Sequence, residues 1–291
     1  MQTSLAVAFL IRIISFNIRY ATNSPFKGEE RWDVRKQYVL NELLFHSRLN
    51  QETFIGLQEV LHPQLQDIST GLNLNTGNEW AYIGVGRNDG KQSGEYSPIF
   101  YRPSIWELEE NNTIWLSETP HIPSKGWDAA SIRIVTIGLF KHRGNGKRVL
   151  ALNTHLDDQG TKARKEGAKL ILSQIREFLA DGAISGVYLS GDFNSEENQE
   201  AYKEFTAPQS SVIDAQKMIK PNERYGNENT YTGFGFEGYP PSRLDYIMVG
   251  PKAEDSSTPW NIKGYGVLGS KFDNGVISSD HRVVIADLEL K

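Results

Sequence analysis

Near the C-terminus, Ser279, Asp280 and His281 stand directly before the apolar run 283–286, which predicts a strand. An adjacent carboxylate and imidazole at the mouth of a strand can activate water. The imidazole takes a proton near neutral pH, and the carboxylate either fixes the ring tautomer or holds a metal. The alternative for an isolated Asp-His pair is an ordinary polar turn. Other polar residues at strand ends are therefore needed to decide between the two.

A second signal is the segment Gly191-Asp192-Phe193-Asn194, which follows another apolar run. Alternation along an extended chain puts Asp192 and Asn194 on one side and turns Phe193 toward the core. An acid and an amide that point the same way can hold a water molecule and a phosphate oxygen. A simple Gly-Asp turn remains the alternative.

Asp245 interrupts the otherwise apolar predicted strand 244–249. A buried carboxylate without a partner costs several kcal/mol, so Asp245 requires a histidine, an arginine or a metal beside it. We predict that His281 is this partner.

Three more polar residues end or follow predicted strands: Asn17, Glu59 and His155. Asn17 could simply close a turn, and His155 could be a satisfied structural histidine. Glu59 could be an exposed end residue, but a rigidly held anionic oxygen is also what a hard divalent cation requires.

The composition is that of an ordinary globular protein: 291 residues, 38% hydrophobic and 23% charged. The net charge of -5 argues against a nonspecific nucleic-acid binder, although a local basic groove stays open. Cysteine is absent, which excludes disulfides, thiolate nucleophiles and cysteine-based zinc sites and leaves the redox compartment undecided.

The N-terminal residues 1–10 are mostly apolar but lack the positive region and cleavage site of a signal peptide. We interpret them as an extension or signal remnant, followed by a single domain, 11–291. No apolar run approaches the roughly 18 residues of a membrane span. A soluble monomer is therefore expected, either intracellular or secreted.

Short runs rich in β-branched residues predict about eleven strands, whereas few segments have helical spacing. So many strands favour two sheets packed face to face with helices outside, which gathers polar strand ends at one rim. The predicted strands are 11–18, 53–57, 80–85, 97–101, 105–108, 132–140, 148–154, 186–189, 244–249, 264–268 and 283–288, and the helices are 32–48, 63–72 and 161–179.

Together, the polar residues occur in an order that resembles the endonuclease/exonuclease/phosphatase superfamily. The motifs that carry the resemblance are Gln58-Glu59, Gly191-Asp192-Phe193-Asn194 and Ser279-Asp280-His281, and the resemblance spans residues 12–290. It implies an α+β fold, the deoxyribonuclease-I-like four-layer α/β/β/α sandwich. It also implies hydrolysis of a phosphoester by in-line attack of water with Mg²⁺ or Mn²⁺.

The resemblance also implies residue roles. Glu59, Asn17 and Asp280 would hold the metal. Asp192 would orient or deprotonate the water, Asn194 would hold phosphate, and His155 and His281 would face the phosphoryl oxygens, with Asp245 pairing His281. Tyr101 matches a family position that faces the phosphate, although a core aromatic is the alternative.

Loops decide the substrate, and three stand out: 86–96, 116–128 and 230–240. In the last, Tyr231 and Phe234 could stack on a base or a sugar, or simply pack the loop. Arg133 could meet an anion or form a salt bridge. Trp127 lies in a segment that resembles a group of bacterial and fungal members, and all four residues are candidates for binding substrate.

Three functions are compatible with these features. The first is a phosphoesterase acting on a phosphorylated small molecule or carbohydrate, mono- or diester. The second is a nuclease or deadenylase-like exonuclease on single-stranded nucleic acid. The third, a non-catalytic binding module, is disfavoured because it would not require so many costly polar groups at one rim.

Overall fold

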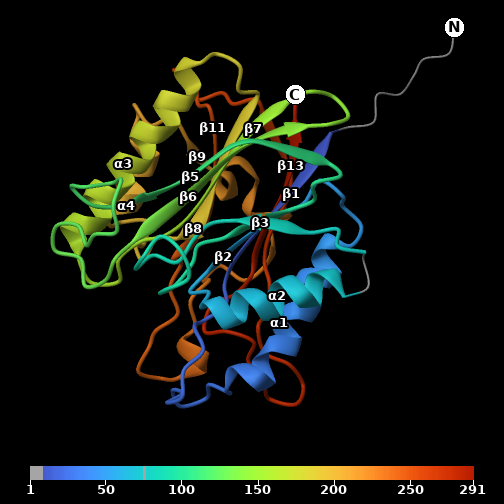
Figure 1. The fold of residues 1–291 in the computed structure, drawn as a ribbon, viewed down its shortest axis with the longest axis vertical. Helices are drawn as coiled ribbons and strands as arrows, with labels where there is room; N and C mark the ends of the chain where they lie inside the picture. The colour runs from blue at the N-terminus through green and yellow to red at the C-terminus, as the bar shows by residue number, and fades with distance from the viewer. Residues whose placement is uncertain (1–8, 75–76) are drawn as a thin grey trace, which may run out of the picture.

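The computed structural model describes residues 9–74 and 77–291, in which the strands form two sheets packed face to face (Figure 1). One sheet has seven strands in the order β10-β12-β13-β1-β2-β4-β3, and the other has six in the order β5-β6-β7-β8-β11-β9. The bounds of the first sheet are β10 (Tyr225–Gly226), β12 (Trp260–Val267), β13 (Val284–Leu290), β1 (Leu10–Asn17), β2 (Phe54–Gln58), β4 (Ile99–Tyr101) and β3 (Ala81–Ile83). Those of the second are β5 (Trp106–Trp115), β6 (Ile134–His142), β7 (Arg148–His155), β8 (Gly186–Asp192), β11 (Asp245–Gly250) and β9 (Ile213–Asp214).

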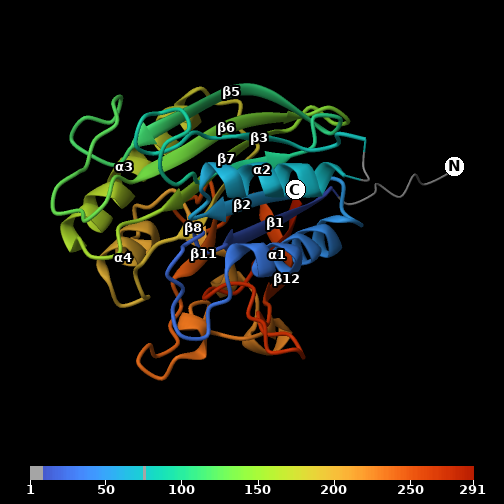
Figure 2. The same ribbon diagram turned by 60° about the horizontal axis from the view of Figure 1, so that its bottom comes forward.

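Four α-helices of the described residues cover the outer faces of the sheets. α1 (Trp32–Ser47) and α2 (His62–Asn73) lie side by side next to β1 and β2, and α3 (Thr161–Ala180) lies with α4 (Glu200–Thr206) on the opposite side of the molecule (Figure 2).

Three apolar layers fill the molecule, one between the two sheets and one between each sheet and its helices. In β1, Ile11 and Ile13 face the other sheet, whereas Ile14 and Phe16 face α1 and α2, as the period-2 alternation of a strand requires. The third layer joins the six-stranded sheet to α3 and α4. The predicted four-layer α/β/β/α sandwich is therefore confirmed.

All eleven predicted strands and all three predicted helices are present, with shifted ends. β5 runs to Trp115 rather than ending at residue 108, because its middle residues 109–112 are polar and exposed at the sheet edge and so lack apolar alternation. The seven-residue α4 and the two-residue β9 and β10 were missed because they are too short to show periodicity. β1 begins at Leu10, inside the proposed extension 1–10, whose residues 1–8 lie outside the described part.

Strand pairing brings the polar strand ends together. β1 and β2 are parallel, with Asn17 opposite Gln58, and β7 and β8 are parallel, with His155 opposite Asp192. β11 runs antiparallel to β8, so its first residue, Asp245, also lies opposite Asp192. Within the described residues, no helix is both long and apolar enough to cross a membrane.

Candidate active site

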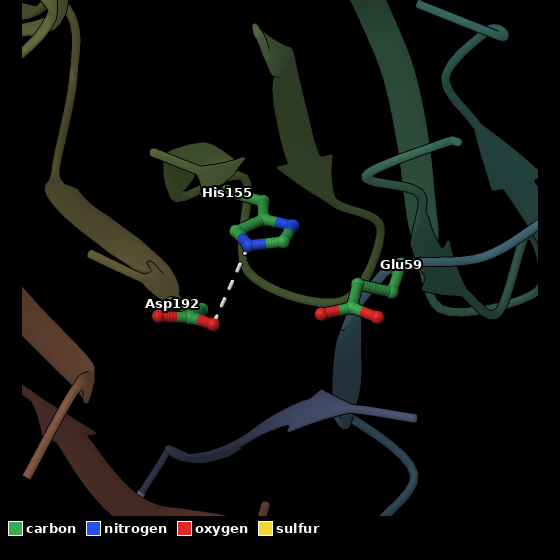
Figure 3. Close-up of side chains that lie close together, drawn as sticks. All are labelled: Glu59, His155 and Asp192. Atoms are coloured by element: carbon green, nitrogen blue, oxygen red, sulfur yellow. Dashed lines mark ion pairs between the residues drawn. The ribbon is translucent and has the colours of Figure 1, made fainter. Parts of the chain in front are cut away.

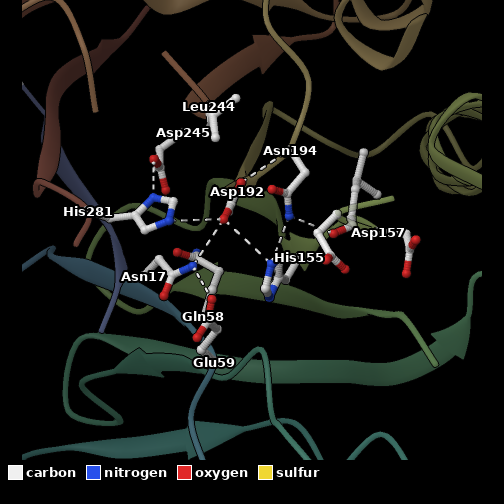
Figure 4. Close-up of polar contacts among 12 residues, drawn as sticks. Asn17, Gln58, Glu59, His155, Asp157, Asp192, Asn194, Leu244, Asp245 and His281 are labelled. Carbon is white, nitrogen blue, oxygen red and sulfur yellow. Dashed lines mark hydrogen bonds and ion pairs between the residues drawn. The ribbon is translucent and has the colours of Figure 1, made fainter. Parts of the chain in front are cut away.

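Asp192, at the end of β8, is the centre of the polar cluster (Figure 4). One carboxylate oxygen accepts a hydrogen bond from Asn17 Nδ2 at 3.0 Å, and the other accepts one from the backbone N–H of Asn194 at 2.9 Å. The Nε2 atoms of His155 and His281 each lie 3.5 Å from Asp192 Oδ2. Asp192 is therefore a buried carboxylate held between two imidazoles and an amide.

His281 and Asp245 form the pair that the sequence predicted. His281 Nδ1 lies 2.7 Å from Asp245 Oδ2, and both side chains are buried. Burial alone would lower the pKa of His281, but the charges of Asp245 and Asp192 outweigh it and raise this pKa well above its usual value. The two carboxylates therefore favour the imidazolium form of the ring, and Asp245 fixes it so that Nε2 faces Asp192.

Glu59 follows β2 with a positive φ of 60°, a conformation that is uncommon for a residue other than glycine. Its carboxylate accepts hydrogen bonds from Asn17 Nδ2 at 3.0 Å and from the backbone N–H of Tyr20 at 3.1 Å. Arg19 Nη1 lies 3.7 Å away and itself follows β1 with a positive φ of 57°. Both residues thus combine an uncommon backbone conformation with a contact between their charged side chains.

Two buried amides join the sheets beneath these residues. Gln58 Nε2 donates to Asn153 Oδ1 at 2.7 Å, and Asn153 Nδ2 donates to the carbonyl oxygen of Leu57 at 2.7 Å. Both side chains are completely buried, so neither bond has to compete with water. Glu59 directly follows Gln58, and His155 lies two residues after Asn153. The two bonds therefore hold Glu59 and His155 at a set separation.

The donor set suits a hard divalent cation. Burial raises the pKa of Glu59, but His155, Arg19 and Asn17 outweigh it and lower this pKa to about 2, so the group is ionised. Burial and the charge of Glu59 raise the pKa of Asp280 to about 6, against the opposite pull of His281. A divalent cation would relieve this repulsion between buried carboxylates.

Ligand atoms of Glu59, His155 and Asp192 lie within 4.8 Å of one another (Figure 3), and this group fits Mg²⁺ or Mn²⁺. It does not include Asp280, and Asn17 turns its NH₂ group toward the carboxylates while its oxygen accepts from the backbone N–H of Arg19. The metal-binding roles of Asp280 and Asn17 stay predictions.

His155 and Asn194 form the other side of the cluster. Asn194 Nδ2 lies 3.0 Å from His155 Nε2. It also donates a hydrogen bond to the carbonyl oxygen of Leu156 at 3.0 Å. His155 Nδ1 has no hydrogen-bond partner in the described part of the chain, although Glu95 Oε2 lies 3.7 Å from it. The amide of Asn194 thus orients His155, and its predicted contact with phosphate remains a prediction.

Arg133 is buried, so its ion pairs are not the surface salt bridge considered from the sequence. Its Nε donates to Asp157 at 3.2 Å and its Nη2 donates to Asp158 at 2.7 Å. Its Nη1 is buried and has no hydrogen-bond partner among residues 9–74 and 77–291.

Asp157 fixes the loop that carries Arg133. Its oxygens accept hydrogen bonds from the backbone N–H groups of Ala130, Ser131 and Gly160 at 2.9, 3.0 and 2.7 Å. Burial raises the pKa of Asp157, but these backbone donors and Arg133 outweigh it, so the pKa lies well below its usual value. The role of Asp157 could not be identified from the sequence, because contacts with residues 130–133 are not visible in local sequence.

We expect Asp157→Asn to lower the free energy of unfolding by about 3–5 kcal/mol, because the amide turns a donor toward buried donors. The control Asp158→Asn, whose side chain is 49% exposed, should cost less than about 1 kcal/mol. Urea unfolding measures both.

The lowered pKa of Asp157 in the folded protein also makes stability depend on pH. The stability that this carboxylate contributes is full above its unfolded pKa of about 3.9 and is lost as the pH falls through its folded pKa. Wild-type protein should therefore lose more stability on acidification than Asp157→Asn, and equal losses would contradict this role.

A cavity of about 900 Å³ opens over the cluster. Tyr231 and Phe234, both candidates from the sequence, line it. Their loop is held to the site by Thr232, whose backbone N–H and hydroxyl donate to the carbonyl oxygen of Asp280 at 2.7 and 3.0 Å. Sequence reasoning missed the lining residues of a fourth loop, between β1 and α1: Arg19, Tyr20, Phe26 and Lys27. Their one available signal was position, since the loop directly follows Asn17.

Four predicted site residues do not line this cavity: Asn17, Asp245, Tyr101 and Trp127. Asn17 and Asp245 still contact it indirectly, through their bonds to Glu59 and His281. Tyr101 is buried between the sheets, with its ring 4.8 Å from that of Phe140, so it occupies the core position that was its alternative. Trp127 lies in the loop before β6, where its backbone N–H donates to Glu118 at 3.1 Å. The neighbouring Asp128 instead accepts from Ala163 N–H at 2.7 Å and caps the start of α3.

A sequence model of the endonuclease/exonuclease/phosphatase family matches residues 14–281. The chain is similar to an endonuclease/exonuclease/phosphatase from Bacteroides vulgatus, with 34% identity and a TM-score of 0.82 over 97% of this chain and 99% of that one. It is also similar to the mannosyl-6-phosphatase of Bacteroides thetaiotaomicron, with 32% identity and a TM-score of 0.81 over 96% and 99%.

Among curated proteins, the chain is similar to a probable CCR4-Not complex 3'-5'-exoribonuclease subunit Ccr4 from Encephalitozoon cuniculi, with 27% identity over 133 residues. That match covers 40% of this chain and 26% of the other protein, so it spans about a quarter of that relative's length.

Proposed function

Since the chain belongs to the endonuclease/exonuclease/phosphatase family, we propose that it is a divalent-metal-dependent phosphatase that removes phosphate from a sugar or from a carbohydrate chain. Hydrolysis of a phosphoester bond, whatever the substrate, follows from membership of the family. The choice of a carbohydrate phosphomonoester rests on the charges of the cavity and on the similarity to a mannosyl-6-phosphatase.

The proposal rests on the charges of the cavity, where carboxylates neutralise almost all of the cationic side chains. Arg87 pairs with Glu95 at 2.7 Å, and Arg133 pairs with Asp157 and Asp158. Arg19 lies 3.5 Å from Glu29 and 3.7 Å from Glu59. Of the cationic side chains that line the cavity, Lys27 alone forms no ion pair within the described residues. The cavity can therefore neutralise one phosphoryl group at its centre, but not the run of phosphates that a nucleic-acid strand presents.

Each polar side chain can then take a definite part in the reaction. Asp192 accepts a proton from the attacking water as the bond from phosphorus to the sugar oxygen breaks, and the departing sugar oxygen takes a proton from solvent. The imidazolium of His281 donates from Nε2 to a phosphoryl oxygen, where negative charge grows in the transition state, and Asp245 holds that ring in place. A Mg²⁺ or Mn²⁺ ion held by Glu59 and Asp192 would supply Lewis-acid charge at the same oxygens.

A substrate panel tests the proposal with protein that has been freed of metal and reloaded with Mg²⁺ or Mn²⁺. The panel contains mannose 6-phosphate, bis-p-nitrophenyl phosphate, oligo(A) RNA and plasmid DNA. We expect kcat/KM to be highest for mannose 6-phosphate and turnover to vanish in excess chelator. Turnover confined to nucleic acid would contradict the proposal.

The second candidate is an exonuclease that acts on single-stranded nucleic acid. The exposed rings of Phe26 and Tyr239 in the cavity favour it, because aromatic rings stack on bases irrespective of sequence. The similarity to an exoribonuclease subunit points the same way but covers less than half of this chain. The oligo(A) arm of the panel distinguishes the two functions.

A further inference from the structure

A row of aromatic rings leads away from the reaction centre along one wall of the cavity. The ring centroid of Tyr231 lies 5.0 Å from that of His281, and the ring of Tyr239 lies 6.5 Å beyond Tyr231. Phe26 and Phe236 lie 6.2 and 5.9 Å from Tyr239. We refer to Tyr231, Tyr239, Phe26 and Phe236 as the aromatic track, and all four line the cavity.

The three rings beyond Tyr231 are exposed. Tyr231 is partly buried beside His281, whereas Tyr239 is 42% exposed, Phe236 is 40% exposed and Phe26 is 53% exposed. Packing of the loop does not account for these rings, because Phe234 is buried in that role and Thr232 already fastens the loop to Asp280. Several large apolar rings left facing water in one cavity indicate a surface that a ligand covers.

The track is held in place before any ligand arrives. Tyr231 and Ser242 pair their backbones in both directions, and the backbone N–H of Tyr239 donates to the carbonyl oxygen of Phe236 at 3.0 Å. The guanidinium of Arg19 lies 5.0 Å from the ring of Phe26, and Lys27 Nζ lies 5.6 Å from that of Phe236. A ligand that binds these rings therefore pays little ordering entropy in the protein.

Size and charge identify the occupant. A cavity of about 900 Å³ is near the upper end of the range of about 300–1,000 Å³ for small-molecule sites, and one phosphorylated sugar would leave the track bare. A nucleic-acid strand would bring a phosphate with each stacked base, yet Lys27 is the single unpaired cation that the described cavity lining offers along the track. A neutral chain with flat apolar faces avoids that difficulty.

Resting on the proposed function, we propose that the aromatic track binds the further sugar residues of a phosphorylated oligosaccharide, so that the substrate is a glycan phosphate rather than a free sugar phosphate. The phosphorylated residue lies next to His281 and Tyr231. The unphosphorylated residues then lie over Tyr239, Phe26 and Phe236.

The test compares kcat/KM for mannose 6-phosphate with that for an α-linked mannotriose phosphorylated at one 6-hydroxyl. Wild-type protein should prefer the phosphotriose by at least about tenfold, the factor that roughly 1.4 kcal/mol of extra binding produces. Tyr239→Ala and Phe236→Ala should bring the ratio of the two values close to one. Tyr82→Ala is the matched control, because Tyr82 is 39% exposed on β3 and does not line the cavity, and the ratio should not change.

Calorimetry with unphosphorylated mannotriose tests the track without turnover. We expect binding to wild-type protein and to Tyr82→Ala, and a loss of binding in Tyr239→Ala. Equal kcat/KM for the two sugar phosphates together with no binding of mannotriose would overturn the track. So would a preference for oligo(A) that disappears in Tyr239→Ala, since that result assigns the track to bases. Hydrolysis of neither sugar phosphate despite mannotriose binding would instead overturn the proposed function and leave the track supported.

Discussion

His281→Asn is expected to lower kcat by about 10²- to 10⁴-fold, the range that general acid or base groups contribute. Asparagine keeps a hydrogen-bonding side chain but loses the positive charge that Asp245 and Asp192 stabilise on the imidazole. The loss falls on the transition state, where charge develops on the phosphoryl oxygens, so kcat should fall much more than KM changes. Steady-state kinetics on mannose 6-phosphate measures both constants.

Asp245→Asn provides the matched variant, because Asp245 acts only through the ring of His281. The double variant should be no slower than His281→Asn alone, since the two side chains work as one unit. Circular dichroism and the thermal midpoint would show whether each variant is folded. A folded His281→Asn protein with nearly full kcat would refute the assignment of His281.

The same pair makes kcat depend on pH. The folded pKa of His281 is raised, so the imidazolium and the activity that requires it persist through neutral pH and are lost as the pH rises through that pKa. Removing the charge of Asp245 lowers the pKa. The alkaline loss of kcat should therefore begin at a lower pH in Asp245→Asn than in wild-type protein.

The Asp245–His281 pair also illustrates what could be predicted from the sequence. Asp245 stands in an apolar run, so burial of a carboxylate and the need for a partner followed from the local pattern alone. The choice of His281 followed from the small number of candidates. Likewise, the two-sheet architecture followed from the number of short apolar runs, because so many strands do not fit one doubly wound sheet.

Residues placed by long-range contacts could not be predicted in this way. Tyr101 lies on a three-residue strand, where one residue of register decides between the cavity and the core, and no local pattern sets that register. Phe26 and Lys27 occupy an irregular loop without periodicity, so only the folded chain shows that they meet Tyr239 and Phe236. Arg133 depends on Asp157 in the same sense, because a contact between neighbouring loops of β6 and β7 brings them together.

Glu59→Gln is expected to weaken binding of Mg²⁺ or Mn²⁺ by more than the 10–100-fold that loss of an outer-shell partner costs, and to lower kcat/KM accordingly. Glutamine keeps the shape but can accept only one of the two hydrogen bonds, because Asn17 and the backbone of Tyr20 donate to different oxygens of Glu59. The change also removes the anionic charge that hard cations require. Titration calorimetry with Mn²⁺ measures the affinity directly. Glu95→Gln is the control, because Glu95 also lines the cavity but pairs with Arg87.

The stability of the metal-free protein gives an independent measure of the same charge. The pKa of Glu59 is lowered to about 2 in the folded protein, against the effect of burial, by His155, Arg19 and Asn17, so its charge stabilises the fold at neutral pH and removing it should lower the metal-free thermal midpoint. In wild-type protein, saturating Mg²⁺ should raise the midpoint by mass action, because the ion binds only the folded state. Glu59→Gln should lose this rise while Glu95→Gln keeps it. If Glu59→Gln instead kept both the rise and the Mn²⁺ affinity, the metal would lie elsewhere, and Glu59 would serve only to hold Asn17 and Arg19 against the reaction centre.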